Sequence, residues 1–241
     1  ILFMILASLP FVLYLKAIRG KPKDLIKDQQ VHGFFKTLII SILIVVFYLI
    51  LTSDFTFSEI LRYSIFNVTS ILTGTGFTST NYNGWGTPII LLFLFITFIG
   101  GCAGSTTCGV KIFRLQIVFN NSKEMISKLI SPNRVVNKRY NGEHLSPEVT
   151  QSVITFLFIF ILTFIVLSVL LSFTGLDLLT SFSAAATSIS NVGPGLGQII
   201  GPAYSFSEIP EIAKWLLSFG MLAGRLEFLT LIVIFNKSFW R

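Results

Sequence analysis

The sequence predicts an all-α polytopic membrane protein made of two copies of one unit: a span, a short helix, a glycine-rich loop and a second span. Three observations predict this. The 241-residue chain is 53% hydrophobic and 12% charged, whereas soluble domains carry about 25% charged residues. Two short glycine-rich stretches, at 73–78 and 191–195, interrupt the apolar sequence in matching positions. Apolar runs that approach the ~20 residues of a spanning helix lie near 37–51, 88–99, 153–173 and 215–235.

The chain begins inside apolar sequence, and residues 1–15 look like the second half of another span. They do not form a signal peptide, because no basic region precedes the apolar run and no cleavage pattern follows it. We therefore expect the chain to be the C-terminal part of a longer polytopic protein.

The net charge of +7 is concentrated in two loops and the tail. Six basic residues lie between Lys16 and Lys36, seven lie between Lys111 and Arg139, and two more end the chain. By the positive-inside rule these segments are cytoplasmic. A basic surface on a soluble protein would suggest nucleic acid, but no nucleic-acid-binding motif accompanies these charges, so we expect no nucleic-acid partner.

The two units agree in spacing. Lys36 precedes Gly76 by 40 residues, and Gln151 precedes Gly193 by 42. The short segments at 58–72 and 178–190 are predicted to be helices that enter the membrane only partway. Thr56 or Ser58, with Glu59, provides N-terminal caps for the first, and Asp177 for the second. A helix that starts outside and ends at mid-membrane presents its negative dipole end there, which favours a cation.

The glycine stretches have a chemical use at the ends of such helices. A dehydrated cation needs oxygens in place of its water shell, and backbone carbonyls supply them when successive carbonyls point inward. Glycine reaches the required backbone angles at little cost. The residues that fit this use are Gly74, Gly76, Gly193 and Gly195, with hydroxyls from Thr73, Thr75 and Thr78. The alternative is that both stretches are ordinary turns between helices.

Two further features lie inside the expected membrane region. Residues 99–109 contain four glycines and three hydroxyl side chains, so we expect this span to unwind, either as a packing kink or as a movable constriction. Arg225 lies near the centre of the last apolar run, where a charge costs about 3 kcal/mol or more unless it is paired or faces a cavity. It either repels a permeating cation or forms a salt bridge to another span.

Enzyme motifs are only approximated. Residues 104–111 resemble a phosphate-binding loop, but Val110 stands where the lysine is needed. Residues 193–197 resemble a dinucleotide fingerprint without its strand–helix–strand context. Cys102 and Cys108 do not have the usual zinc spacing. We therefore expect no enzymatic activity.

Taken together, these motifs make the chain similar to the C-terminal half of a TrkH-type subunit of the Trk/Ktr/HKT potassium transporter superfamily. The matching stretches are 73–78, 99–106, 191–197 and 221–227. The resemblance implies span–pore helix–filter loop–span repeats around a pseudo-fourfold pore. It divides the chain into 1–18, the end of the second repeat; 19–36, a cytoplasmic basic loop; 37–115, the third repeat; 116–148, a second cytoplasmic basic loop; and 149–241, the fourth repeat. One departure is Thr107-Cys108, where relatives tend to have two glycines.

The resemblance also implies roles for individual residues. The K⁺ selectivity filter would comprise Thr73, Gly74, Thr75, Gly76, Phe77, Asn191, Val192, Gly193 and Pro194. Within it, K⁺ would contact the carbonyls of Gly74, Thr75, Asn191 and Val192. The gate would comprise Gly100, Gly101, Gly104, Ser105, Gly109 and Arg225.

The function implied by the resemblance is K⁺ uptake by a pore-forming subunit in the bacterial inner membrane, with K⁺ as the transported ion and no covalently bound cofactor. The implied partners are a second copy of the subunit, a cytoplasmic nucleotide-binding regulatory subunit of the TrkA type, the N-terminal half of the transporter and the lipid bilayer. The alternative is a membrane scaffold or an inactive fragment of such a transporter that moves no ions.

Overall fold

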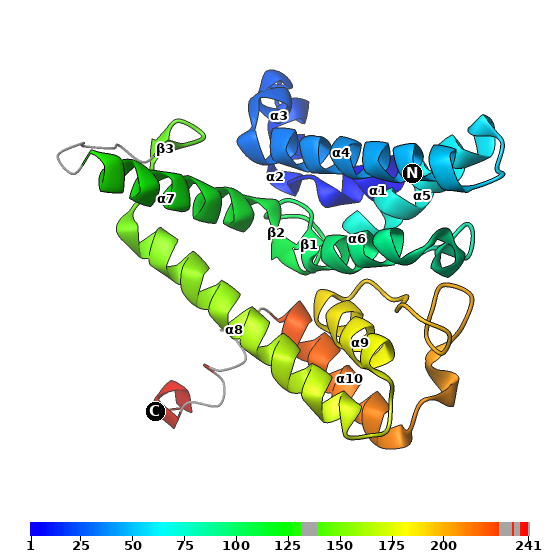
Figure 1. The fold of residues 1–241 in the computed structure, drawn as a ribbon. Helices are drawn as coiled ribbons and strands as arrows, with labels where there is room; N and C mark the ends of the chain where they lie inside the picture. Colours follow the sequence, from blue (N-terminus) through cyan, green and yellow to red (C-terminus); the bar gives the residue numbers. More distant parts are fainter. Residues whose placement is uncertain (132–138, 227–232, 234–236, 241) are drawn as a thin grey trace.

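The computed structural model describes residues 1–131, 139–226, 233 and 237–240. Figure 1 shows two groups of helices that lie side by side. The first contains α1 (Leu2–Ser8), α2 (Phe11–Ile18), α3 (Lys23–Lys27), α4 (Gln29–Thr52), α5 (Phe57–Leu72), α6 (Thr87–Phe98) and α7 (Ile112–Ile130). The second contains α8 (Pro147–Ser172), α9 (Leu178–Ser190) and α10 (Glu211–Arg225).

Shorter elements join these helices. Strands β1 (Ile99–Gly100) and β2 (Val110–Lys111) form a parallel pair between α6 and α7. Strands β3 (Arg139–Tyr140) and β4 (Glu143–His144) form an antiparallel hairpin between α7 and α8. The described part of the chain also contains the 3₁₀ helices η1 (Tyr82–Trp85), η2 (Phe206–Glu208) and η3 (Lys237–Trp240).

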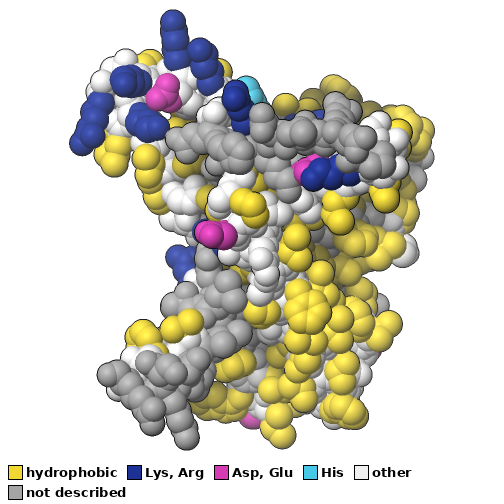
Figure 2. Space-filling model, turned by 90° about the vertical axis from the view of Figure 1, so that its left-hand side faces the viewer, with side chains coloured by type: hydrophobic (Ala, Val, Ile, Leu, Met, Phe, Trp, Pro, Cys, Tyr) yellow, Lys and Arg dark blue, Asp and Glu magenta, His cyan; other side chains and the backbone are white. Residues whose placement is uncertain are grey.

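The longest helices are apolar over most of their surface. In the described part of the chain, α4 and α8 are long and apolar enough to cross a membrane, and α6 and α9 are shorter apolar helices. Large apolar side chains remain exposed on α4 and α8, for example Phe47 and Phe158. Figure 2 shows a broad apolar surface. Most of the Lys and Arg side chains visible in this view lie in the upper part of the picture. This distribution fits a chain whose outer face meets lipid.

The two short helices start where their capping residues predict. Glu59 Oε2 accepts a hydrogen bond from the Thr56 N–H at 2.9 Å, as in a capping box, and a second one from the Thr56 hydroxyl at 2.7 Å. Asp177 Oδ2 accepts from the Thr180 N–H at 3.2 Å. Most of α9 is buried, and α10 lies so close to it that a Cβ on Gly224 would collide with the Ile189 carbonyl. The small side chains of α9 permit this approach.

Three segments differ from the sequence-based expectation. Residues 1–15 form two short helices rather than one, because Pro10 lacks an N–H and keeps Leu9 extended. Helix α4 begins at Gln29, inside the segment expected to be a loop, because Asp28 caps it there. Helix α7 occupies much of the second expected loop and runs to Ile130. The last expected span is described only as far as α10; most of residues 227–241 lie outside the described residues.

Within the described residues, the core comprises two apolar clusters that meet at the second glycine stretch. One cluster is built from α4, α5 and α6, and the other from α8, α9 and α10. Val192 and Leu196 follow α9 in the chain, yet they pack in the first cluster. The second glycine stretch therefore bridges the two groups of helices.

Candidate functional site

The first glycine loop (residues 73–78) folds back onto the end of α5. The N–H groups of Thr75 and Gly76 both donate to the Ser70 carbonyl, at 2.9 and 3.3 Å. The hydroxyls of Thr73 and Thr75 lie 2.8 Å apart, and Thr73 also donates to the Ser70 carbonyl at 3.3 Å. The loop is thus attached to its own helix through both its backbone and its threonines.

The second glycine loop (residues 191–197) is attached to α9 in the same manner. The Val192 N–H donates to the Thr187 carbonyl at 3.1 Å, and the Gly193 N–H donates to the Thr187 hydroxyl at 2.8 Å. Asn191, in the left-handed conformation with φ of 51°, caps the helix, and its amide donates to the Met221 carbonyl of α10 at 3.0 Å. This loop therefore has one additional support, from α10.

The carbonyl groups of both loops differ from the N–H groups. Among the described residues, no hydrogen bond is accepted by the carbonyl oxygens of Gly74, Thr75, Gly76 or the residues 191–193. A backbone oxygen without a partner normally requires water, an ion or another ligand. The loops thus present unpaired oxygens at the C-terminal ends of two helices, where the helix dipole adds negative potential.

The two loops touch each other at their glycines. A Cβ on Gly76 would collide with the Val192 carbonyl and would lie 3.0 Å from Pro194 Cδ. Gly76 and Gly193 also have φ of 76° and 119°, which side chains other than glycine rarely adopt. Farther along, the Asn83 amide donates to the Gly197 carbonyl at 2.6 Å. Of the residues predicted for the filter, Thr75, Phe77 and Gly193 are exposed, Phe77 to 66%.

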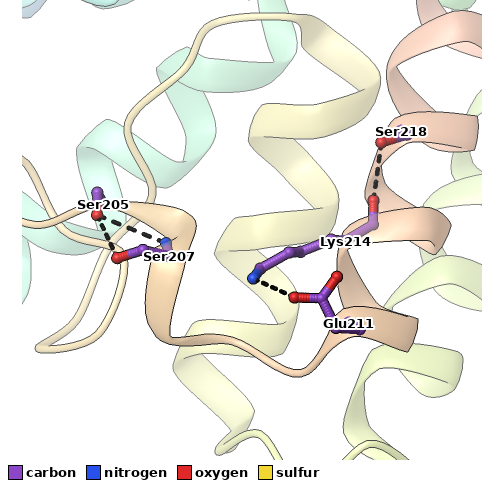
Figure 3. Close-up of polar contacts among 5 residues, drawn as sticks. All are labelled: Ser205, Ser207, Glu211, Lys214 and Ser218. Carbon is purple, nitrogen blue, oxygen red and sulfur yellow. Dashed lines mark hydrogen bonds and ion pairs between the residues drawn. The ribbon is translucent and has the colours of Figure 1, made fainter.

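A cavity of about 380 Å³ lies between the second glycine loop and α10. Its lining includes Lys214, whose Nζ lies 2.7 Å from Glu211 Oε1 one turn earlier. Figure 3 shows the two side chains pointing toward each other, with the Ser218 hydroxyl bonded to the Lys214 carbonyl at 2.8 Å. The sequence interpretation did not single out Lys214; the Glu211–Lys214 spacing of three residues on a helix was the available signal.

Between α6 and α7 the chain leaves the helical path. Ile99 and Gly100 pair in parallel with Val110 and Lys111. The two ends of the α6–α7 loop (residues 101–109) therefore lie next to each other. The structure places Gly100 at this pairing, where a Cβ would collide with the Cys108 carbonyl. The expectation that this span is interrupted is confirmed by the helix bounds.

Inside the α6–α7 loop, hydroxyl groups replace the missing helical hydrogen bonds. The Gly101 N–H donates to the Thr107 hydroxyl at 2.9 Å, and the Ser105 hydroxyl donates to the Cys102 carbonyl at 2.6 Å. Gly104 and Gly109 turn the chain with φ of 74° and 77°. These bonds pair part of the loop's backbone without helical structure.

Other segments hold the α6–α7 loop from outside. The Cys102 N–H donates to the Ser8 carbonyl at 2.9 Å, and the Phe11 N–H donates to the Gly104 carbonyl at 3.0 Å. The break at Pro10 therefore supplies partners to this loop. The Ala103 N–H donates to Gln30 Oε1 of α4 at 2.8 Å.

Arg225 contacts the same loop from α10. Its Nη1 lies 2.9 Å from the Thr106 carbonyl oxygen and 3.1 Å from Cys108 Sγ. A polar pocket of about 110 Å³ adjoins these atoms. The structure therefore brings together Arg225 and the predicted gate segment, although its partners, Thr106 and Cys108, were not among the predicted gate residues.

Helix α10 also connects the two parts of the site. Met221 accepts the hydrogen bond from Asn191 of the second glycine loop, and Arg225 follows four residues later, about 6 Å along the axis.

A family model described as "TrkH: Cation transport protein" matches residues 1–241. The chain belongs to the TrkH family.

Relatives within this family support the same assignment. The chain is 43% identical over 240 residues to the Trk system potassium uptake protein TrkI of Halomonas elongata, covering 100% of this chain and 49% of that protein. It is 33% identical over 247 residues to the TrkH of Vibrio parahaemolyticus, covering 100% of this chain and 50% of that protein. The crystal structure of the potassium transporter TrkH from Vibrio parahaemolyticus matches with a TM-score of 0.91 and 31% identity, covering 100% of this chain and 52% of that one. The chain spans about half the length of these TrkH-family relatives.

Proposed function

We propose that the chain forms the C-terminal part of the pore-forming subunit of a K⁺ uptake system. The observation that carries this proposal is the pair of touching glycine loops, whose N–H groups bond to their own helices while the carbonyls of 74–76 and 191–193 accept no hydrogen bond within the described residues. Such carbonyls replace the water shell of a dehydrated K⁺. The carbonyls of Gly74, Thr75, Asn191 and Val192 are the proposed K⁺ contacts.

Two loops provide only part of a ring of oxygens around an ion. The relatives are about twice as long as this chain, and we propose that their N-terminal half supplies two further loops in a pseudo-fourfold arrangement. The units at 37–115 and 149–241 are then the third and fourth repeats.

The α6–α7 loop and Arg225 form the proposed gate. Arg225 of α10 donates a hydrogen bond to this loop, so a positive charge lies beside the non-helical segment between α6 and α7. A cation that passes this point is repelled until the loop and Arg225 move together. The exposed apolar surface of α4 and α8 supports insertion in a bilayer.

The proposed location is the bacterial inner membrane, with the basic segments and the C-terminus in the cytoplasm by the positive-inside rule. The proposed assembly is a homodimer with a cytoplasmic nucleotide-binding subunit of the TrkA type. It involves no nucleic acid.

The test is Rb⁺ uptake into cells that lack their own K⁺ uptake. The cells express the joined subunit, which we define as this chain fused to the N-terminal half of the Halomonas elongata relative. We expect uptake with a preference for Rb⁺ over Na⁺, and loss of that preference in Gly193→Ser. The nearest atom to a Cβ at Gly193 is Gly76 Cα at 3.9 Å, so the Cβ has room, and we expect the substitution to act mainly through the backbone angle.

The matched control is Gly175→Ser. Gly175 has φ of 88° and no atom within 4 Å of the position that a Cβ would occupy, so the substitution also places a side chain at a positive φ, in the turn between α8 and α9 and outside the glycine loops. If both variants lose preference equally, Gly193 has no role in selectivity. Absence of uptake from a well-expressed, membrane-inserted joined subunit would favour a scaffold or inactive fragment.

A further inference from the structure

The link between Gln30 and the α6–α7 loop continues to the cytoplasmic hairpin. Gln30 lies in the first turn of α4, and its side chain accepts the Ala103 N–H at 2.8 Å. Its own N–H donates to Asp28 Oδ1 at 2.7 Å. One residue is therefore bound to the cap of α4 by its backbone and to the loop by its side chain.

The other oxygen of Asp28 binds the β3–β4 hairpin. Asn141 Nδ2 donates to Asp28 Oδ2 at 2.8 Å, and Asn141 Oδ1 accepts from the Gln29 N–H at 2.9 Å. The single Asn141 amide thus uses both of its ends on the start of α4, although it is more than a hundred residues away in sequence. Asn141, with φ of 49°, lies in the turn between β3 and β4, at the tip of the hairpin.

A second set of contacts holds the hairpin against α7. The Tyr140 hydroxyl donates to Gln116 Oε1 at 2.6 Å, and Gln116 Nε2 donates to the Gln29 carbonyl at 2.8 Å. Burial raises the pKa of Tyr140, which keeps its hydroxyl protonated and able to donate. The hairpin therefore contacts two helices next to the α6–α7 loop: α7, which follows the loop, and α4, which provides Gln30.

We propose that Gln30 is a positioning residue for the α6–α7 loop, and that the β3–β4 hairpin sets its position through Asn141, Asp28 and Gln30. This inference rests on the proposed role of the loop as a gate. Movement of the hairpin shifts the start of α4, and the Gln30 side chain carries that shift to the Ala103 N–H. The position of the cytoplasmic hairpin thus determines the position of a loop inside the membrane.

The test compares Gln30→Leu with Gln30→Glu in the joined subunit. Leucine removes the acceptor for the Ala103 N–H, so the loop loses one restraint and Rb⁺ uptake rises by about fivefold, the change in an equilibrium that one hydrogen bond supports. Glutamate keeps an acceptor and restores uptake close to that of the parent. The preference for Rb⁺ over Na⁺ stays unchanged in both, because the glycine loops are untouched.

The matched control is Gln29→Leu. Gln29 is an exposed neighbour whose contacts within the described residues use only its backbone N–H and carbonyl. We expect parental uptake. The inference is overturned if Gln30→Leu leaves Rb⁺ uptake at the level of Gln29→Leu. It is also overturned if Gln30→Glu raises uptake as much as Gln30→Leu does.

The role of the hairpin is tested with Asn141→Gly, which tolerates the left-handed backbone and removes the amide. We expect increased uptake, and no further increase when Asn141→Gly is combined with Gln30→Leu, because both act on one path. Additive effects of the two substitutions on uptake would show that the hairpin acts independently of Gln30, which would contradict the inference.

A second readout does not depend on transport. Cys102 is fully buried and Cys108 is partly exposed, so a maleimide reports the accessibility of the α6–α7 loop at Cys108, with Cys108→Ser as the background. Gln30→Leu should label faster than the parent, and Gln30→Glu should not. If the parent moves no Rb⁺, the proposed function fails, and the labelling rates still decide whether Gln30 positions the loop.

Discussion

The two glycine loops and the α6–α7 loop differ in what holds them. The glycine loops at 73–78 and 191–197 bond mainly to the helices that directly precede them, over short separations in sequence. The α6–α7 loop bonds to residues near positions 7–11, to Gln30 and to Arg225, which lie in four helices: α1, α2, α4 and α10. Local attachment favours a fixed geometry, as a selective site requires. Attachment to several elements allows the position of the α6–α7 loop to change when any one of them moves.

The largest effect is expected from Gly76→Ser, which breaks the fixed geometry of the glycine loops. Its Cβ would collide with the Val192 carbonyl, and φ of 76° adds about 1–2 kcal/mol of backbone strain. We expect Rb⁺ uptake to fall more than tenfold in the joined subunit. Gly74→Ser provides the comparison, since Gly74 has φ of 66° but no atom within 4 Å of the position that a Cβ would occupy. Equal losses in the two variants would show that contact between the loops is unimportant.

Arg225→Gln tests the attachment of the α6–α7 loop to α10. It removes a charged donor from the Thr106 carbonyl and from Cys108 Sγ, and hydrogen bonds to charged groups contribute about 1.5–3 kcal/mol. Rb⁺ uptake should rise by about tenfold, with the preference over Na⁺ unchanged.

The control for this prediction is Arg62→Gln. Arg62 is exposed on α5 and lies over the Tyr63 ring at 4.9 Å from its centroid. It should leave uptake unchanged. A decrease in uptake for Arg225→Gln, rather than an increase, would show that Arg225 supports the open pore or the fold instead of closing the gate.

The parts of the structure that sequence predicted are the local ones. Asp177 and Thr56 cap helices through contacts within three residues, and the glycines of both loops follow directly from the helix ends. The interruption after α6 also follows from local composition. These features depend on neighbours in the chain, so residue type and spacing were sufficient.

The parts that sequence did not predict depend on tertiary contacts. Pro10 divides the first segment, but its consequence is that Ser8 presents a carbonyl to Cys102, which no local pattern indicates. Gln30 was placed in a loop, and its contact with Ala103 joins residues 73 positions apart. Cys108 became a partner of Arg225 through the packing of α10 against the α6–α7 loop. The filter and gate assignments themselves stay predictions that the experiments above test.

A smaller effect is expected at the cavity beside the second glycine loop. Glu211→Gln removes the partner of Lys214 and leaves an ammonium group in the lining of that cavity. An exposed pair of this kind contributes about 0.2–1 kcal/mol, so Rb⁺ uptake should fall by less than about fivefold, and added salt should reduce the difference. Glu208→Gln, an exposed acid on η2, is the control. Equal decreases in both variants would indicate a general effect of surface charge rather than one of Lys214.

The smallest effect concerns how firmly the first glycine loop is anchored through α5. Hydrogen bonds from the Thr56 hydroxyl and N–H lower the pKa of Glu59 in the folded protein. A lowered folded-state pKa contributes stability above the unfolded value of about 4.3, and this contribution disappears as the pH falls through the folded pKa. The melting temperature of the joined subunit in detergent should therefore be slightly higher than that of Glu59→Gln at pH 7, and the difference should close below about pH 4. A difference that persists at low pH would mean that Glu59 acts through packing rather than through its charge, and the capping box would then contribute nothing that titrates.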